Sequence, residues 1–167
     1  MDTSSRGTNV RGSRSLQAAV GDTADHILFL HAITGCDTTS YLYKQSKDQW
    51  LKKLMDSKQL RDTVSVYNNP GSSLDQLSAA GEIFLLHLYG FPKAGTLDKA
   101  RYAMYKRTIA RQPLTSKFDL ATLPPTSASS RLHFARVYLQ VQAWRGIQLN
   151  PLDWGWHTGR LASAAES

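Results

Sequence analysis

The stretch from Ala24 to Ser40 reads ADHILFLHAITGCDTTS, an apolar segment that runs into a glycine and a polar cluster. Residues 24–33 are apolar nearly all round, which is typical of a buried helix or a central strand. We favour a helix, because the segments that follow it are helical in pattern. Gly35 then ends the helix, as glycine does at helix C-termini. Asp37 is therefore expected at the exposed end of a buried helix, where a metal ion or a phosphate could meet it.

Polar residues on either side of this helix predict its boundaries. The triplet Gly21-Asp22-Thr23 offers a helix start, and the hydroxyls of residues 38–40 are expected to cap the next short helix. His26 and His31 are five residues apart, so they do not share a helix face as a metal-binding pair would. We expect both to be core or interface histidines.

Apolar spacing and capping residues predict four further helices. Two of them cover 47–56 and 127–146. The other two begin after a capping residue: one follows Ser73, and the other covers 97–111 after Thr96. No stretch shows convincing period-2 alternation. The fold class is therefore mainly α, an irregular helical domain.

The apolar residues of two of these helices predict how they pack. Those expected to face inward on the helix 47–56 are Trp50, Leu51, Leu54 and Met55. The last helix is apolar on two sides, one with Leu132, Ala135 and Leu139, the other with Phe134, Val137, Val141 and Trp144. We expect it to pack through the middle of the domain.

Length and composition predict one domain in a chain of 167 residues. We expect residues 1–15, rich in Ser, Thr, Gly and Arg, to be disordered, 16–160 to form a single helical domain, and 161–167 to fray. Cys36 is the single cysteine, so an intramolecular disulfide and a Cys-based zinc site are excluded. This suits an intracellular, reducing compartment, nuclear or cytoplasmic. No apolar run approaches the roughly 20 residues of a membrane span, so no membrane contact is expected.

The positive charge of the chain is concentrated in one block. The formal net charge is +7, and from Lys93 to Lys117 seven basic residues stand against Asp98 alone, a net +6. Such a block favours a polyanionic partner, DNA or RNA, although a solvated lysine-rich face is an equal alternative. The candidate nucleic-acid contacts are Lys99, Lys106 and Arg107. Tyr102 and Tyr105 could stack on bases, but their helical spacing favours packing in the core or at its rim.

The run 24–54 resembles a segment of the flap-endonuclease class of structure-specific nucleases, which have PIN-like folds. In that class a buried helix ends in Gly-(Cys/Ser)-Asp-Tyr, and a helix–two-turn–helix element with a Gly-Ile-Gly-x-Lys hairpin follows. The matching segments here are 28–37 and 47–54. The resemblance implies the helical C-terminal half of a PIN-like α/β fold. It also implies that Asp37 belongs to a carboxylate cluster for two Mg²⁺ ions.

The chain departs from this pattern in its carboxylates. The role of metal ligand carries over to Asp37 only, and none of the upstream acids Asp2, Asp22 and Asp25 lies in a strand-like segment. Asp22 reads as a cap, and Asp25 is expected in a first helical turn, where it suits the helix dipole. We do not expect the isolated chain to be a competent nuclease. Mg²⁺ is expected only if sequence upstream supplies the missing carboxylates.

The hairpin is a second departure. A Gly-x-Gly turn lets backbone amides approach phosphates, and this chain lacks both glycines between 42 and 47. Lys44 and Lys47 are present and are expected to make point-charge contacts with phosphates.

A second resemblance covers almost the whole chain. Three runs match in order: His31 to Ser40, Leu123 to Ala128 (LPPTSA), and Tyr138 to Trp144 followed by Trp154-Gly155-Trp156. They are similar to those of a group of uncharacterised metazoan proteins, many derived from mobile elements. The resemblance does not imply a function.

The Trp-rich tail supports an alternative function. Trp154 and Trp156 are expected to pack back on the body or to grip a protein partner. Our first hypothesis is a catalytically incomplete, nuclease-like helical domain that binds nucleic acid through a basic helix. The alternatives are a structural or protein-interaction module that uses the tail, and a mobile-element relic with no selected role.

Overall fold

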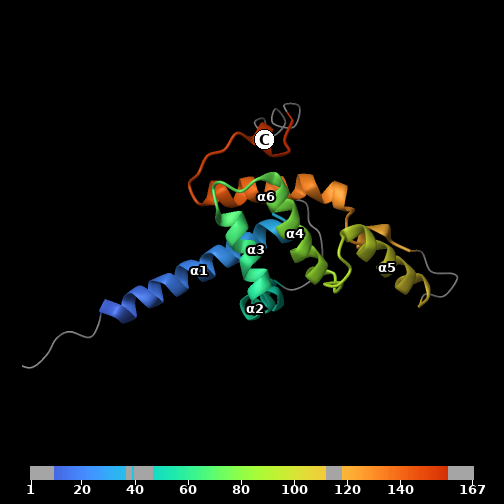
Figure 1. Cartoon of the computed structure of the whole chain (residues 1–167), viewed down its shortest axis with the longest axis horizontal. Coiled ribbons are helices and arrows are strands. Elements are labelled where there is room, and N and C mark those ends of the chain that lie inside the picture. The colour runs from blue at the N-terminus through green and yellow to red at the C-terminus, as the bar shows by residue number, and fades with distance from the viewer. Residues whose placement is uncertain (1–9, 37–38, 40–46, 112–117, 158–167) are drawn as a thin grey trace, which may run out of the picture.

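The computed structural model describes residues 10–36, 39, 47–111 and 118–157, and this part of the chain is mainly α (Figure 1). The helices are α1 (Val10–Thr34), α2 (Lys47–Asp56), α3 (Lys58–Asn68), α4 (Leu74–Leu88), α5 (Leu97–Ile109) and α6 (Ser127–Trp144). Two 3₁₀ turns, η1 (Leu120–Thr122) and η2 (Pro151–Trp154), complete the described elements. The predicted fold class is confirmed.

Helix α6 packs against α1, α3 and α4 and thereby organises the core (Figure 1). Its polar side chains also hold the end of α3. The Nε2 of Gln142 donates to the carbonyl of Tyr67 at 2.8 Å, and the Oη of Tyr138 donates to that of Asn69 at 3.0 Å. The two apolar sides of α6 predict that it packs through the middle of the domain, and this prediction is confirmed. Its outermost apolar residues, Leu132 and Trp144, are exposed, however.

An aromatic cluster fills the space between the helices. Phe29 of α1 contacts Tyr67 of α3 and Phe84 of α4, with ring centroids 4.9 and 5.1 Å apart. Trp50 of α2 joins Phe84 at 5.9 Å. All four rings are fully buried, so this cluster fixes α1 to α4 around one core.

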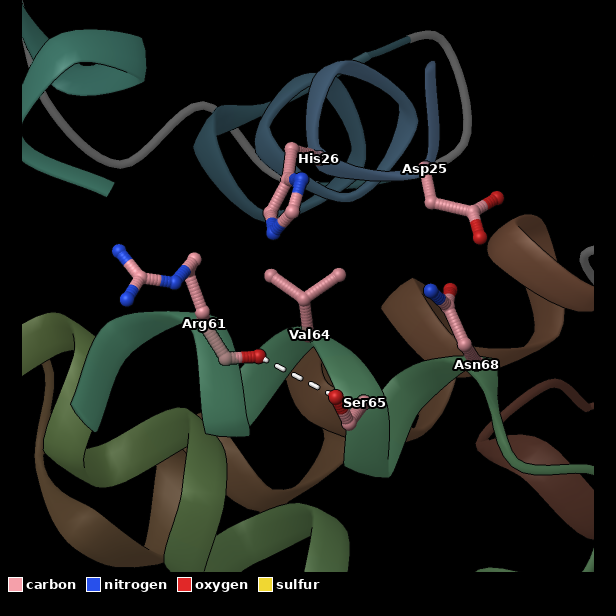
Figure 2. A pocket seen from close by; sticks show the side chains of 6 residues that line it. All are labelled: Asp25, His26, Arg61, Val64, Ser65 and Asn68. Carbon is pink, nitrogen blue, oxygen red and sulfur yellow. Dashed lines mark hydrogen bonds between the residues drawn. The ribbon is translucent and has the colours of Figure 1, made fainter. Parts of the chain in front are cut away.

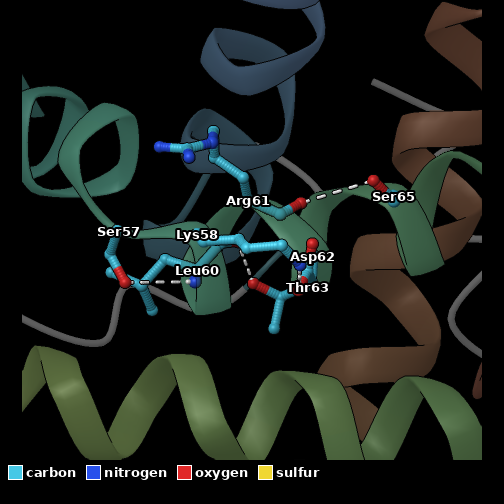
Figure 3. A network of polar contacts seen from close by, with 7 residues as sticks. All are labelled: Ser57, Lys58, Leu60, Arg61, Asp62, Thr63 and Ser65. Carbon is cyan, nitrogen blue, oxygen red and sulfur yellow. Dashed lines mark hydrogen bonds and ion pairs between the residues drawn. The ribbon is translucent and has the colours of Figure 1, made fainter.

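Helix α3 is an element that the sequence patterns above do not predict. Ser57 caps it by accepting from the amide of Leu60, and Lys58 pairs with Asp62 at 2.9 Å (Figure 3). The buried residues of α3 follow a helical spacing and are Leu60, Thr63, Val64 and Tyr67. The sequence of α3 therefore contains a capping residue and a helical apolar spacing, but the segment is short and directly follows the predicted helix 47–56.

The long first helix corrects two expectations. It begins at Val10, well before the predicted start at Gly21-Asp22-Thr23, and it overlaps the segment 1–15 predicted to be disordered. The glycines inside it lower helix propensity by about 1 kcal/mol each without ending the helix. Asp25 consequently lies mid-helix, where it pairs at 2.9 Å with Arg145, the residue that follows α6, and does not serve the helix dipole.

Smaller differences concern helix ends and faces. Helices α5 and α6 end at Ile109 and Trp144, two residues short of the predicted ends. Met55, predicted to face inward on α2, is 41% exposed, whereas Trp50 and Leu54 are buried and Leu51 is partly buried against the core. Ser73 and Thr96 cap α4 and α5 as predicted.

Candidate nucleic-acid interface

The end of α1 is a hydrogen-bonded turn. Gly35 takes a positive φ of 116°, as predicted for a helix-ending glycine. Beyond it, the Oγ1 of Thr39 donates to the carbonyl of Ala32 at 2.7 Å and accepts from the amide of Cys36 at 2.9 Å. Thr39 therefore closes the helix that precedes it, which corrects the expectation that it caps the next one. Thr38 and Ser40 lie outside the described residues.

The candidate metal ligand Asp37 and the candidate phosphate contact Lys44 also lie outside the described residues. Within the described part of the chain, no three His, Cys, Asp or Glu side chains gather as a metal site would require. Lys47, at the start of α2, places its Nζ 2.6 Å from the Nδ1 of His31, and the His31 ring stacks on Trp144. Lys47 thus has a partner within the protein, and His31 is exposed rather than part of the core.

His26, the other histidine of α1 discussed above, borders a small polar cavity between α1 and α3. The cavity has a volume of about 200 Å³ and is lined by Asp25, His26, Arg61, Val64, Ser65 and Asn68 (Figure 2). His26 is only 8% exposed, so it is a core histidine, as expected. Within the described chain, its Nδ1 and the Oδ1 of Asn68 are buried without a protein partner. Such a setting suits an ordered water molecule.

The basic helix α5 is anchored at its N-terminal half. The carboxylate of Glu82 in α4 accepts from the amide of Leu97 at 2.7 Å and from the hydroxyl of Ser127 at 2.6 Å. Arg101 donates to the carbonyl of Pro124 at 2.6 Å. These contacts, with the buried side chains of Leu97 and Ala100, fix which face of α5 points outward.

The outward face carries two of the three nucleic-acid contacts that are predicted on α5. Lys99 and Lys106 are exposed and seven residues apart, so they lie on one side of the helix, about 10 Å apart along its axis. Tyr102 lies between them, 63% exposed, with its ring centroid 5.4 Å from the Nζ of Lys106. We call Lys99, Tyr102 and Lys106 the basic stripe. None of the ion pairs among the described residues involves it.

The third predicted contact, Arg107, lies on another flank of α5. Its guanidinium lies 4.8 Å from the ring centroid of Phe91, in the loop that follows α4. The sequence-based prediction groups Arg107 with the two lysines. Helical geometry separates it from them, because Lys106 and Arg107 are consecutive residues and point about 100° apart.

Tyr102 is more exposed than its helical spacing predicts. The spacing favours packing for both tyrosines, yet most of the Tyr102 side chain is exposed. Tyr105 is a rim residue that contacts Phe118 edge-on at 5.5 Å. The signal that could have distinguished them is position: Tyr102 lies three residues after Lys99 and four before Lys106, which places it on their side of the helix.

The Trp-rich tail packs back on α6. Trp154 contacts Tyr138, with ring centroids 4.5 Å apart, and the carbonyl of Gly155 accepts two hydrogen bonds from the guanidinium of Arg136 at 3.0 and 3.1 Å. The same guanidinium lies 5.3 Å from the ring centroid of Trp156. Both tryptophans are half-buried by these contacts. Of the two roles expected for the tail, packing on the body is the one observed.

Comparisons of the chain with protein-family models, with curated proteins and with solved structures find no match. None of the helices in the described part of the chain is both long and apolar enough to cross a bilayer.

Proposed function

We propose that this chain is a helical nucleic-acid-binding domain whose contact surface is the basic stripe of α5. The observation that carries the proposal is that Lys99, Tyr102 and Lys106 share one exposed helix face, with no acidic partner among the described residues. Ammonium groups beside an exposed aromatic ring can neutralise phosphates and stack on bases.

The charge around the stripe supports the same proposal. Between Lys93 and Arg111, all described, six basic residues accompany a single acid, Asp98. The carboxylate of Asp98 lies at the N-terminal end of α5, 3.3 Å from the amide of Ser127. The rest of this segment thus presents uncompensated positive charge, which favours a polyanion by releasing its counterions.

We also propose that the chain is related to PIN-like nucleases. The Gly35-Cys36-Asp37 run, which follows a buried helix in the sequence, supports this relation. The proposed activity is binding, not cleavage, because the run supplies one carboxylate and a two-metal site needs several. A protein-interaction role for the tail has weaker support, since Trp154 and Trp156 are engaged with α6.

The test is a charge reversal on the stripe. We expect Lys99→Glu/Lys106→Glu to weaken binding of a fluorescent oligonucleotide at low salt by at least tenfold, measured by anisotropy. The slope of log K against log salt should fall by about 1.4 to 1.8 for the two lost contacts.

The matched control reverses two exposed lysines elsewhere, in Lys52→Glu/Lys58→Glu, so that net charge changes equally. We expect this variant to lose far less affinity. Equal losses in both variants, or wild-type binding that is absent or insensitive to salt, would overturn the proposal.

A further inference from the structure

We infer that α5 selects single-stranded nucleic acid, by accepting one unpaired base in a hollow beside the basic stripe. This inference rests on the proposed function and names its substrate class. The hollow has a volume of about 260 Å³ and lies between α5 and the η1 turn. Its lining residues are Arg101, Tyr102, Tyr105, Leu120 and Leu123.

The chemistry of the walls fits a planar aromatic ring. Leu123 is buried, Leu120 is exposed at the rim, and Tyr102 and Tyr105 contribute aromatic surface. The guanidinium of Arg101 is held in place by the carbonyl of Pro124 at 2.6 Å. Apolar and aromatic surface beside a fixed guanidinium is the combination on which exposed bases stack.

The size of the hollow favours a single base. Its volume is below the roughly 300–1,000 Å³ of pockets that enclose whole small-molecule ligands. A base could enter while its phosphates remain outside, because Tyr102 both lines the hollow and lies in the basic stripe between Lys99 and Lys106. The side chain of Tyr102 therefore joins the two parts of the proposed site.

The distinction between single strands and duplexes follows from this geometry. In a duplex each base is paired and stacked on its neighbours, so a base must first leave the stack before it can enter the hollow. The lysines, in contrast, can contact the phosphates of either form. Single strands should bind through both parts of the site, and duplexes through the lysines alone.

The experiment compares a 12-nucleotide single strand, its duplex and the same strand with abasic sites, as DNA and as RNA, by anisotropy. The wild type should bind the single strand at least about fivefold more tightly than either other form, given the usual contribution of one stacked base. Tyr102→Ala should lose at least fivefold on the single strand and less than twofold on the duplex. Tyr102→Phe should retain wild-type affinity, because the ring is kept.

Ile109→Ala on the same helix, also exposed, is the matched truncation control and should change neither affinity. Tyr102 is largely exposed, so its truncation leaves the core intact, and circular dichroism would verify the fold. An equal preference for duplex and single strand, or an unchanged single-strand affinity in Tyr102→Ala, would overturn the inference. If the lysine reversal abolishes binding and Tyr102→Ala does not alter it, the base-binding hollow is wrong and the proposed function stands.

Discussion

At the scale of single residues, His133 couples the core to pH. Its Nε2 donates to the carbonyl of Ile33 at 3.0 Å, and its Nδ1 is buried without a partner among the described residues. Burial lowers the pKa of His133 to about 4; the Ile33 carbonyl opposes this shift, and the nearby Arg136 adds to it. The unfolded imidazole titrates near pH 6.5, so as the pH falls the unfolded chain takes up this proton first.

We therefore expect the free energy of unfolding to decrease between about pH 6.5 and pH 4, by roughly 3 kcal/mol from this group. Urea denaturation across that range measures the decrease. His133→Gln keeps an N–H donor for Ile33 but does not titrate, so its curve should be flatter than that of the wild type. Identical pH profiles for the two proteins would show that His133 is not the titrating group.

Single-residue roles were predictable where a local rule decided them. Gly35, Ser73 and Thr96 have backbone or capping roles that depend on their immediate neighbours, and the structure agrees with each. The roles predicted for Thr39 and Asp25 were wrong. Their partners, Ala32 and Arg145, are set by how the chain folds back and by which helices meet.

At the scale of elements, the crossing of α4 and α6 depends on Gly81. A Cβ placed at this position would lie 2.4 Å from Cδ1 of Phe134 and 2.5 Å from the Oη of Tyr67. Tyr67 is itself fixed, since its hydroxyl donates to the carbonyl of Leu77 at 2.9 Å. The missing side chain is thus what lets the two helices approach so closely.

We expect Gly81→Ala to lower the free energy of unfolding by about 1–2 kcal/mol, because overpacking outweighs the gain in helix propensity. Urea denaturation at neutral pH measures the change. Gly21→Ala is the matched control: a Cβ on Gly21 of α1 would meet no atom within 4 Å, so this change should be neutral or stabilising by up to about 1 kcal/mol. A Gly81→Ala protein as stable as Gly21→Ala would contradict the close crossing.

A helix was predictable where its own sequence carries a clear capping residue and a clear apolar face. Helices α4, α5 and α6 combine a capping residue with an apolar face, and their existence and type were predicted. Helix α3 has a capping residue, Ser57, and a buried face as well, but one of its four buried positions is the polar Thr63. The start of α1 was not predicted, because its first turns lack a strong apolar pattern and include Gly12, which lowers helix propensity.

At the scale of the whole molecule, the basic stripe lies on a helix at the edge of the apolar core. The core joins α1, α2, α3, α4 and α6, and α5 adds the buried side chains of Leu97 and Ala100 to it. Helix α5 otherwise packs mainly against α4 and extends to one side (Figure 1). The concentration of charge in residues 93–117 was predictable from composition. Which of its side chains share a face was not, because that depends on the anchoring of α5 through Glu82 and Arg101.

The most direct measurement is an NMR titration of the ¹⁵N-labelled chain, which at 18.6 kDa is within reach of amide-resolved spectra. The titrant is a 12-nucleotide single strand at low salt. We predict that amide shifts concentrate on α5, around Lys99, Tyr102 and Lys106, and on η1, with little change on α2 or on the tail at Trp154. Shifts centred on α2 or the tail, or no shifts at all, would contradict binding through the outer face of α5.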